Sequence, residues 1–301
     1  MDTIAKLYNY DIFINFIAQI IYIKWGRIMT NFERIKAYYN VFNEWGRLDM
    51  PEGKLEFDLS MPIIMNHLPL QAEILDLGGG PGRYTIELAK LGHILHLADL
   101  SQALLDEAKN KIDEYGITNI KSIMQVNAVD LTDYGDGSFD AVLLFGPLYH
   151  LTNEDERISC VKEVNRVLKP NGIVFASFIP YLTGAIGVAS RMFYYPEQVD
   201  VKTLERVFGN GVFHNNADRG FQEGYYPTSD EVVTLFGEYG FSKVLLRSIR
   251  GWGSNREEQI YRLKDENPEK YATVIDLINK TADVPPIIEM CSHAMYIGRK
   301  Q

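Results

Sequence analysis

The sequence predicts an α/β protein built on a doubly wound, mostly parallel sheet of about seven strands. Short β-rich runs alternate with helix-length amphipathic segments through the middle of the chain, which is typical of βαβ units. The first such run ends in a turn from Gly78 to Gly82 that holds four glycines and one proline. The alternation stops over residues 181–227 and then resumes, which indicates a cap inserted after the fifth strand.

The composition favours a globular protein and disfavours nucleic acid as a partner. The 301 residues are 46% hydrophobic, enough for a sizeable core. Forty acidic against thirty basic residues give a formal charge of -10. This charge repels phosphate backbones, so we expect no nucleic-acid partner. Cys160 and Cys291 lie far apart without a CxxC pattern, which suits a reducing cytoplasm and predicts neither a disulfide framework nor a zinc cluster.

Residues 1–28 form an N-terminal extension of uncertain status. Its apolar part, Tyr8 to Ile23, includes Asp11, Asn15 and Gln19 and is shorter than the ~20 apolar residues that span a bilayer, so we expect no stable membrane insertion. Three interpretations stay open: a helix packed on the body, an interfacial helix, or an extension upstream of a natural start at Met29.

Helices precede the first strand. Thr30 to Glu33 form a capping-box pattern that opens a helix, and the apolar spacing stays helical to Leu68 around a loop at 50–53. Residues 29–70 are therefore expected to form a helical lid.

Residues 71–180 carry the βαβ units of the core. Ser101 and Gly116 are the expected N-cap and terminator of the second helix. Strands are expected at 73–77, 93–98, 121–126, 139–144 and 172–178, and helices at 83–91, 102–115 and 154–168.

The remaining chain divides into a cap and a C-terminal part of the core. Residues 181–227 are rich in Gly, Tyr, Phe and Asn without strand alternation, which predicts an irregular cap. In residues 228–301, a capping box at Thr228 to Glu231 starts a helix to Tyr239. A strand at 241–248, a helical insertion at 257–280 and a last edge strand at 293–298 follow.

The glycine turn predicts a nucleoside site, because ligands of open α/β sheets bind at the carboxyl ends of the strands. Gly78, Gly80 and Gly82 lack the Cβ atoms that would keep a ligand away from the backbone. The helix beginning at Arg83 directs free N–H groups to the same place. Asp99 ends the second strand, where its carboxylate can accept both hydroxyls of a ribose.

The spacing of the motifs distinguishes between nucleosides. A dinucleotide pattern G-x-G-x-x-G would need glycine where Arg83 stands. The pattern Asp76-x-Gly78-x-Gly80-x-Gly82 instead resembles the first motif of class I S-adenosylmethionine-dependent methyltransferases. The resemblance covers about residues 74–178 and continues through the segments 97–101, 126–131, 137–142 and 168–172.

This resemblance implies a Rossmann-like fold with an antiparallel last strand, S-adenosylmethionine as cofactor and S-adenosylhomocysteine as product. It implies that the glycine loop holds the methionine part of the cofactor, supported by Asp76, and that Asp99 holds the ribose. Asn127 stands where the family often has aspartate, but its carbonyl oxygen can still accept a hydrogen bond. The cofactor-binding residues so implied are Asp76, Gly78, Gly79, Gly80, Gly82, Asp99, Leu100, Asn127, Ala128 and Phe145.

The turn after the fourth strand, Phe145 to Leu151, is the position that lines the reacting centre in this family. His150 is the candidate general base, because histidine exchanges protons near neutral pH. Tyr149 can line the methyl pocket with its ring. The alternatives are that His150 opens the next helix and that Tyr149 packs on the core.

A Gly-Pro-Leu-Tyr-His-Leu turn together with Leu55-Glu56-Phe57 is similar to a bacterial subgroup of small-molecule-type methyltransferases. In such enzymes the leading helices and the insert after the fifth strand close over the substrate. The aromatic stripes in the cap can equally be packing between cap and body. Substrate-binding candidates are Tyr39, Glu56, Arg191, Tyr194, His214 and Tyr226.

No metal is expected. His93 and His96 are three apart in a predicted strand, so they point to opposite faces, and no cysteine or acid completes a ligand set.

The leading hypothesis is methyl transfer to oxygen or nitrogen of a small molecule by in-line displacement. Alternatives are a non-catalytic protein that binds S-adenosylmethionine and a methyltransferase acting on a protein or RNA. Arg83 disfavours an NAD-linked oxidoreductase. An oligomer is possible, and the acceptor cannot be read from the sequence, because acceptor choice depends on pocket shape.

Overall fold

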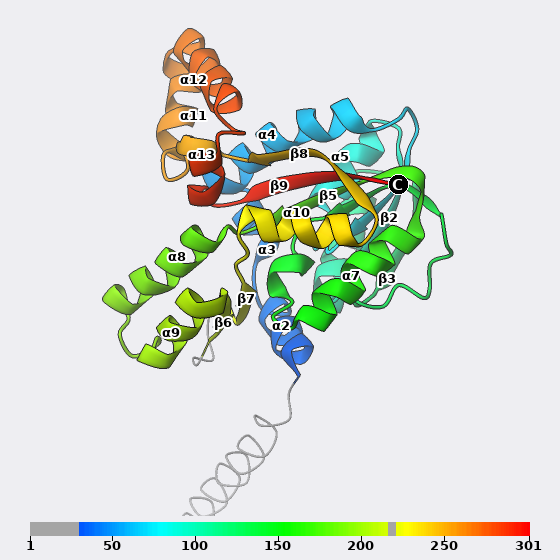
Figure 1. The fold of residues 1–301 in the computed structure, drawn as a ribbon. Helices are drawn as coiled ribbons and strands as arrows, with labels where there is room; N and C mark the ends of the chain where they lie inside the picture. Colours follow the sequence, from blue (N-terminus) through cyan, green and yellow to red (C-terminus); the bar gives the residue numbers. More distant parts are fainter. Residues whose placement is uncertain (1–29, 216–220) are drawn as a thin grey trace, which may run out of the picture.

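The computed structural model describes residues 30–215 and 221–301, so the predictions for residues 1–28 lie outside the described residues. The described residues form a seven-stranded sheet in the order β3-β2-β1-β4-β5-β9-β8 (Figure 1). This arrangement confirms the predicted fold class. The strands are β1 (Glu73–Leu77), β2 (Ile94–Asp99), β3 (Ile120–Gln125), β4 (Phe139–Leu144), β5 (Leu168–Phe178), β8 (Phe241–Ser248) and β9 (Ala294–Lys300).

The chain order reverses between β1 and β4, which lie side by side at the centre of the sheet. The pairs from β3 to β5 are parallel, while β9 runs antiparallel to both β5 and β8. The prediction that 293–298 is an edge strand was therefore wrong. Three consecutive residues of β9, Met295, Tyr296 and Ile297, are fully buried, as an inner strand covered on both faces requires.

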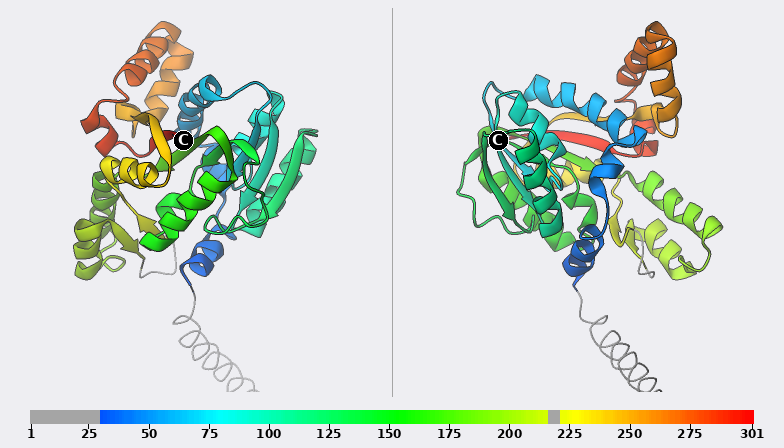
Figure 2. Two further views of the ribbon diagram at one scale, coloured as in Figure 1. Left: turned by 45° about the vertical axis from the view of Figure 1, so that its right-hand side comes forward. Right: turned by 180° about the vertical axis from the view of Figure 1, so that it is seen from behind.

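Helices cover both faces of the sheet, as Figures 1 and 2 show. Ile74 and Leu143 pack on the face below α4 and α5, whereas Leu75 and Leu144 pack on the face below α7 and α10. These neighbours alternate because successive strand residues point to opposite faces. The helices are α4 (Pro51–His67), α5 (Arg83–Lys90), α6 (Gln102–Glu114), α7 (Glu154–Val167) and α10 (Ser229–Glu238).

For the leading helices, the predicted start is confirmed and the predicted loop is wrong. Thr30 and Glu33 form the predicted capping box of α2 (Asn31–Tyr39). A short α3 (Glu44–Leu48) follows, and α4 starts at Pro51. The expected loop at 50–53 was wrong, because proline in the first turn of a helix needs no N–H partner.

The insert after β5 forms a lobe beside the sheet (Figures 1 and 2). It contains α8 (Tyr181–Tyr194), α9 (Val201–Asn210) and an antiparallel pair, β6 (Val212–His214) and β7 (Glu223–Tyr225). The expectation of an irregular cap was wrong, because α8 and α9 make most of the insert helical. Its two strands of three residues are too short to show alternation in the sequence.

The C-terminal part begins with the predicted capping box of Thr228 and Glu231. The expected single helical stretch at 257–280 is two helices, α11 (Glu257–Glu266) and α12 (Pro268–Lys280), because Asn267 caps a new helix before Pro268. Two 3₁₀ turns, η1 (Pro147–His150) and η2 (Gly251–Gly253), and α13 (Pro285–Met290) complete the described elements. Within the described residues, no helix combines the length and apolarity needed to cross a membrane.

Candidate functional site

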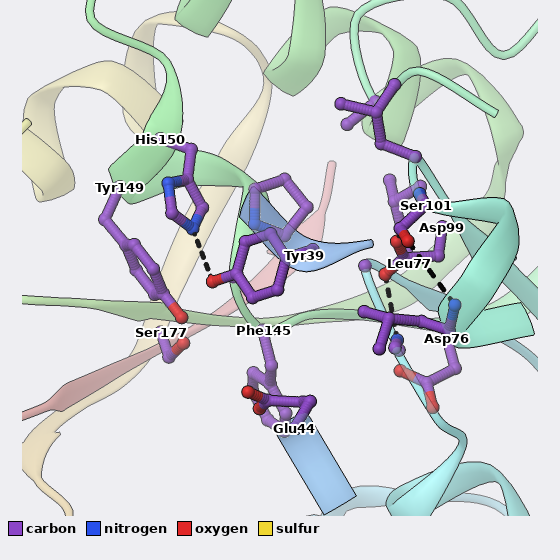
Figure 3. Close-up of a pocket in the computed structure, with 18 of the residues that line it drawn as sticks. Tyr39, Glu44, Asp76, Leu77, Asp99, Ser101, Phe145, Tyr149, His150 and Ser177 are labelled. Atoms are coloured by element: carbon purple, nitrogen blue, oxygen red, sulfur yellow. Dashed lines mark hydrogen bonds between the residues drawn. The ribbon is translucent and has the colours of Figure 1, made fainter. Parts of the chain in front are cut away.

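A cavity lies at the carboxyl edge of the sheet, over the place where β1 and β4 meet. One end is lined by the glycine turn and by residues that follow β2 and β3. The other end is lined by residues from η1, β5 and the approach to β9, and the leading helices α2 to α4 cover both ends. Figure 3 shows Asp76, Asp99 and Ser101 on one side of this cavity and Tyr149 and His150 on the other.

The glycine turn and the acid after β2 are in direct contact. The Gly80 amide donates to Oδ2 of Asp99 at 2.9 Å, and the Ser101 amide donates to Oδ1 at 2.8 Å (Figure 3). Each carboxylate oxygen has a second lone pair, so Asp99 can also accept hydroxyl groups from a ligand. Gly78 has a φ of +77°, and a Cβ there would lie 2.4 Å from Cδ of Pro147. The turn is thus closed to side chains.

Asp76 lies under the turn with half of its hydrogen-bonding capacity unused. Oδ2 accepts the hydroxyl of Thr85 at 2.6 Å, while Oδ1 is buried without a hydrogen-bond partner among the described residues. Burial raises the pKa of Asp76 and the pKa of Asp99 to about 6. A buried carboxylate with an unused acceptor fits a ligand that brings an amine or hydroxyl donors, as an amino-acid nucleoside such as S-adenosylmethionine does.

The other residues expected at the cofactor lie in the same place, with one exception. Leu100, Asn127, Ala128 and Phe145 line the cavity. Oδ1 of Asn127 accepts the Val129 amide at 3.3 Å, which holds the turn after β3. Gly82 is not among the lining residues; it is the N-cap of α5, in a left-handed conformation.

His150 is hydrogen-bonded through both ring nitrogens. Nδ1 lies 3.0 Å from the backbone carbonyl of Glu223, and Nε2 lies 2.9 Å from the hydroxyl of Tyr39 (Figure 3). A carbonyl only accepts, so Nδ1 carries the proton and Nε2 accepts from Tyr39. Burial lowers the pKa of His150 to about 4 and raises the pKa of Tyr39 well above its ordinary value. His150 is therefore a neutral imidazole with no free nitrogen.

Tyr149 lies between two histidines at the same end of the cavity. Its ring centroid is 4.9 Å from that of His150 and 5.8 Å from that of His293. Burial raises the pKa of Tyr149, so its hydroxyl stays protonated near neutral pH.

A second polar group at this end was missed by sequence reasoning. Nδ1 of His293 lies 2.9 Å from Oε2 of Glu56, and Arg250 Nε lies 3.7 Å from the same oxygen. Glu56 was a substrate-binding candidate, and both it and His293 line the cavity. The sequence offered one signal: His293 directly precedes an antiparallel strand, whose start lies at the carboxyl edge of the parallel strands.

The structure does not bring the four cap candidates to the cavity; of the substrate-binding candidates only Tyr39 and Glu56 line it. Arg191 lies 5.7 Å from the ring of Phe213, and Tyr194 is 79% exposed. His214 pairs with the side chain of Glu223, and Tyr226 is buried in the core of the cap. These residues hold the cap together or face away from the cavity.

His93, just before β2, and His96, within β2, have structural partners. His93 Nδ1 accepts the Ala72 amide at 3.1 Å, and His96 lies between Ser122 and Glu73. Among the residues at 30–215 and 221–301, no group of three or more His, Cys, Asp or Glu side chains could hold a metal ion.

Comparison with known proteins agrees with this geometry. Residues 74–172 match the family described as the methyltransferase domain. Among curated proteins, the chain is 25% identical over 178 residues to the ubiquinone/menaquinone biosynthesis C-methyltransferase of Haemophilus ducreyi, covering 57% of this chain and 65% of the relative. It is 34% identical over 145 residues to the protein of the same name from Shewanella baltica, covering 47% of this chain and 54% of the relative. The chain therefore spans less than two thirds of the length of these relatives.

Solved structures share the fold. An S-adenosylmethionine-dependent methyltransferase from Methanosarcina mazei has a TM-score of 0.56 at 20% identity, over 79% of this chain and 97% of its own. A protein from Pyrococcus horikoshii has a TM-score of 0.60 at 16% identity, over 88% and 99%. The 1,6-didemethyltoxoflavin-N1-methyltransferase of Burkholderia thailandensis, solved with its substrate and S-adenosylhomocysteine, has a TM-score of 0.52 at 16% identity, over 89% and 85%.

The fold and the contact between Gly80 and Asp99 define a nucleoside-binding, doubly wound α/β protein. Residues 74–172 therefore form a methyltransferase domain, and this part of the chain resembles the class I S-adenosylmethionine-dependent methyltransferases. Over these residues, the resemblance expected from the motifs is confirmed.

Proposed function

We propose that this protein is an enzyme that transfers a methyl group from S-adenosylmethionine to oxygen or nitrogen of a small molecule. The observation that carries the proposal is the 2.9 Å hydrogen bond from the Gly80 amide to Asp99, made at one end of a cavity whose other end carries different polar groups. One cavity thus offers a nucleoside end and an acceptor end.

The residues at the nucleoside end have distinct roles in this proposal. Asp99 accepts the ribose hydroxyls, Leu100 packs on the adenine, and the Ala128 amide with Asn127 contacts its edge. Asp76 Oδ1, buried and unpartnered among the described residues, accepts from the amino group of the methionine part. When bound, the cofactor supplies a methyl group already activated by the sulfonium charge, so the protein need not provide a nucleophile.

The acceptor end positions a small molecule and excludes water. Phe145, Tyr149 and Ile249 give it apolar walls. The hydroxyl of Tyr39 donates a hydrogen bond to His150. The lone pairs of the hydroxyl oxygen can accept a hydrogen bond from an O–H or N–H of the acceptor. His150 thus fixes the direction of the Tyr39 hydroxyl, a positioning role in place of the direct base expected from the sequence.

The net charge and the cysteines bear on the acceptor class and on the cellular compartment in this proposal. A net charge of -10 disfavours RNA as the acceptor, and both cysteines are free and buried, as suits a reducing cytoplasm. A second candidate reaction is methyl transfer to carbon, which the name of the curated relatives favours.

Calorimetry with S-adenosylhomocysteine tests the nucleoside end. We expect binding by the wild-type protein and loss of detectable binding in Asp99→Ala. Asp106→Ala is the matched control, since Asp106 is an exposed acid on α6 that pairs with Lys109. Equal affinity in Asp99→Ala and the control would refute the ribose assignment.

A methyl-release assay tests catalysis. Labelled S-adenosylmethionine is offered with a panel of phenols, amines and carboxylic acids, and the methylated atom is identified by NMR. A product methylated at oxygen or nitrogen supports the proposal, and one methylated at carbon supports the second candidate. Tight cofactor binding without turnover on the panel or a cell extract would indicate a non-catalytic binding protein.

A further inference from the structure

The acceptor end of the cavity contains two histidines in opposite electrostatic settings. His150 faces a backbone carbonyl and a tyrosine hydroxyl, with both nitrogens engaged. His293 faces the carboxylate of Glu56 through Nδ1 at 2.9 Å. No hydrogen bond to its Nε2 is recorded among the described residues, and its side chain lines the cavity.

The tautomer of His293 follows from its partner. Burial raises the pKa of Glu56, but His293 and the guanidiniums of Arg250 and Arg47 together lower it by more, to about 2, so the group is a carboxylate. A carboxylate only accepts hydrogen bonds, so Nδ1 of His293 must carry a proton. In the neutral imidazole the lone pair then lies on Nε2.

The charged groups around His293 carry a net negative charge. Glu56 Oε2 lies 3.7 Å from Arg250 Nε, and Arg250 in turn pairs with the buried Glu257. Arg47, which also acts on Glu56, pairs with Glu44. Three carboxylates and two guanidiniums give this cluster a net charge of one negative unit, which offsets a positive charge formed at His293. The other ionisable neighbours are Tyr149, 5.8 Å away between ring centroids, and Cys291, whose thiol donates to the His293 carbonyl at 3.0 Å. Burial keeps both of these protonated, since it raises the pKa of each.

The position of His293 in the fold separates it from the nucleoside end. It directly precedes β9, which begins at the carboxyl edge beside β5, whereas the glycine turn and Asp99 follow β1 and β2. A group at His293 therefore meets the acceptor and not the adenosine.

From this geometry we propose that His293 is the catalytic base of the reaction and that Glu56 is its positioning residue. The proposal rests on the proposed function and restricts the acceptor to a molecule with a removable proton, such as a phenol or an amine. The acceptor atom forms a bond to the methyl carbon as the sulfonium–methyl bond breaks, and the acceptor's proton passes to Nε2 of His293. The charge balances, because the positive charge lost at sulfur reappears on the imidazolium.

The kinetic test uses His293→Gln, Glu56→Gln and a control, His67→Gln, whose histidine on α4 bonds to the Ile63 carbonyl and does not line this cavity. With the acceptor that the methyl-release panel identifies, we expect His293→Gln to lower kcat on the order of 100-fold or more while affinity for S-adenosylhomocysteine is unchanged. Glu56→Gln should lower kcat with little change in KM, and His67→Gln should match the wild type. A kcat of His293→Gln within a factor of about three of wild type would overturn the proposal.

A spectroscopic test does not depend on turnover. In ¹⁵N NMR of the ligand-free protein, neutral His293 should show the Nδ1-protonated tautomer, with that preference lost in Glu56→Leu, which removes the acceptor. If neutral His293 of the wild type carries its proton on Nε2, the proposed pairing of His293 with Glu56 is overturned, even if the enzyme is active. Conversely, a protein inactive on every acceptor contradicts the proposed function, while the tautomer still decides whether Nε2 is available.

Discussion

The hydroxyl of Tyr39 donates a 2.9 Å hydrogen bond to Nε2 of His150, which joins α2 to η1 across the covered side of the cavity. The contact explains why burial can lower the pKa of His150 to about 4 without leaving its nitrogens unsatisfied. It also ties the lid to the core at the acceptor end.

Tyr39→Phe should therefore destabilise the protein, because it leaves the buried Nε2 without a donor. We expect the free energy of unfolding to fall by ~1–3 kcal/mol, measured by urea denaturation. Tyr115→Phe is the control, since this tyrosine is 45% exposed at the end of α6. Equal stability of the two variants would mean that the hydrogen bond contributes nothing.

Gly78→Ala should abolish binding of S-adenosylhomocysteine. The φ of +77° disfavours any residue with a Cβ, and this Cβ would lie 2.4 Å from Cδ of Pro147. The turn must shift and carry the backbone amides of the loop with it. Calorimetry checks the affinity.

Gly187→Ala in α8 is the matched control for that variant. A Cβ there meets nothing within 4 Å, so affinity should be unchanged and stability unchanged or higher by up to ~1 kcal/mol. Retained binding in Gly78→Ala would show that the turn tolerates a side chain.

The nucleoside end of the site could be predicted from the sequence because its signals are local. Gly78 to Gly82 lie in one turn, and Asp99 ends the next strand, so the topology of a parallel sheet alone brings them together. The hydrogen bond between Gly80 and Asp99 is the direct outcome.

The acceptor end could not be predicted in the same way. His293 meets Glu56 across 237 positions of sequence, and only the insertion of β9 between β5 and β8 makes them neighbours. The substrate-binding candidates of the cap do not reach the cavity, because they pack within the cap or face solvent. Their aromatic side chains suggested a ligand, but Tyr226 packs against Phe213 inside the cap, and Tyr194 faces solvent.

Cofactor affinity should rise with pH. Burial raises the pKa of Asp76 and the pKa of Asp99 to about 6, so both are largely protonated at about pH 5 and ionised at about pH 7.5. A carboxyl that binds S-adenosylmethionine only as a carboxylate must first lose its proton. At about pH 5 this requirement lowers the affinity about tenfold for each such carboxyl, compared with about pH 7.5. Calorimetry at the two pH values checks this, and Asp76→Asn should flatten the difference, whereas Asp106→Asn should not.

The stability of the ligand-free protein should change in the opposite direction through the same carboxyls. Because their pKa values are raised in the folded state, the native protein holds these protons more tightly than the unfolded chain, so their contribution falls as pH rises from about 4 to about 6. Comparing urea denaturation of the wild type and Asp76→Asn across this range isolates the effect. A difference between the two that does not vary with pH would show that Asp76 is ionised throughout.

Arg34 should prove to be the main electrostatic link between the lid and the cap. Its Nη1 lies 2.9 Å from Oε1 of Glu223, a side chain with no solvent exposure, and its Nη2 donates to the Asn215 carbonyl at 2.6 Å. The Glu223 carbonyl also fixes the tautomer of His150. Arg34→Ala leaves a buried carboxylate with His214 as its remaining ion-pair partner, and we expect the free energy of unfolding to fall by ~3 kcal/mol.

The double variant Arg34→Ala with Glu223→Gln separates the ion pair from simple loss of packing. If the cost of Arg34→Ala comes from an uncompensated charge, removing that charge restores part of the stability, and the double-mutant cycle gives a coupling well above zero. Lys280→Ala is the control, because its pair with Asp276 is exposed and should be worth less than ~0.5 kcal/mol. If Arg34→Ala were no more destabilising than Lys280→Ala, the ion pair between Arg34 and Glu223 would contribute nothing measurable to stability. His150 would then keep its tautomer without help from Arg34.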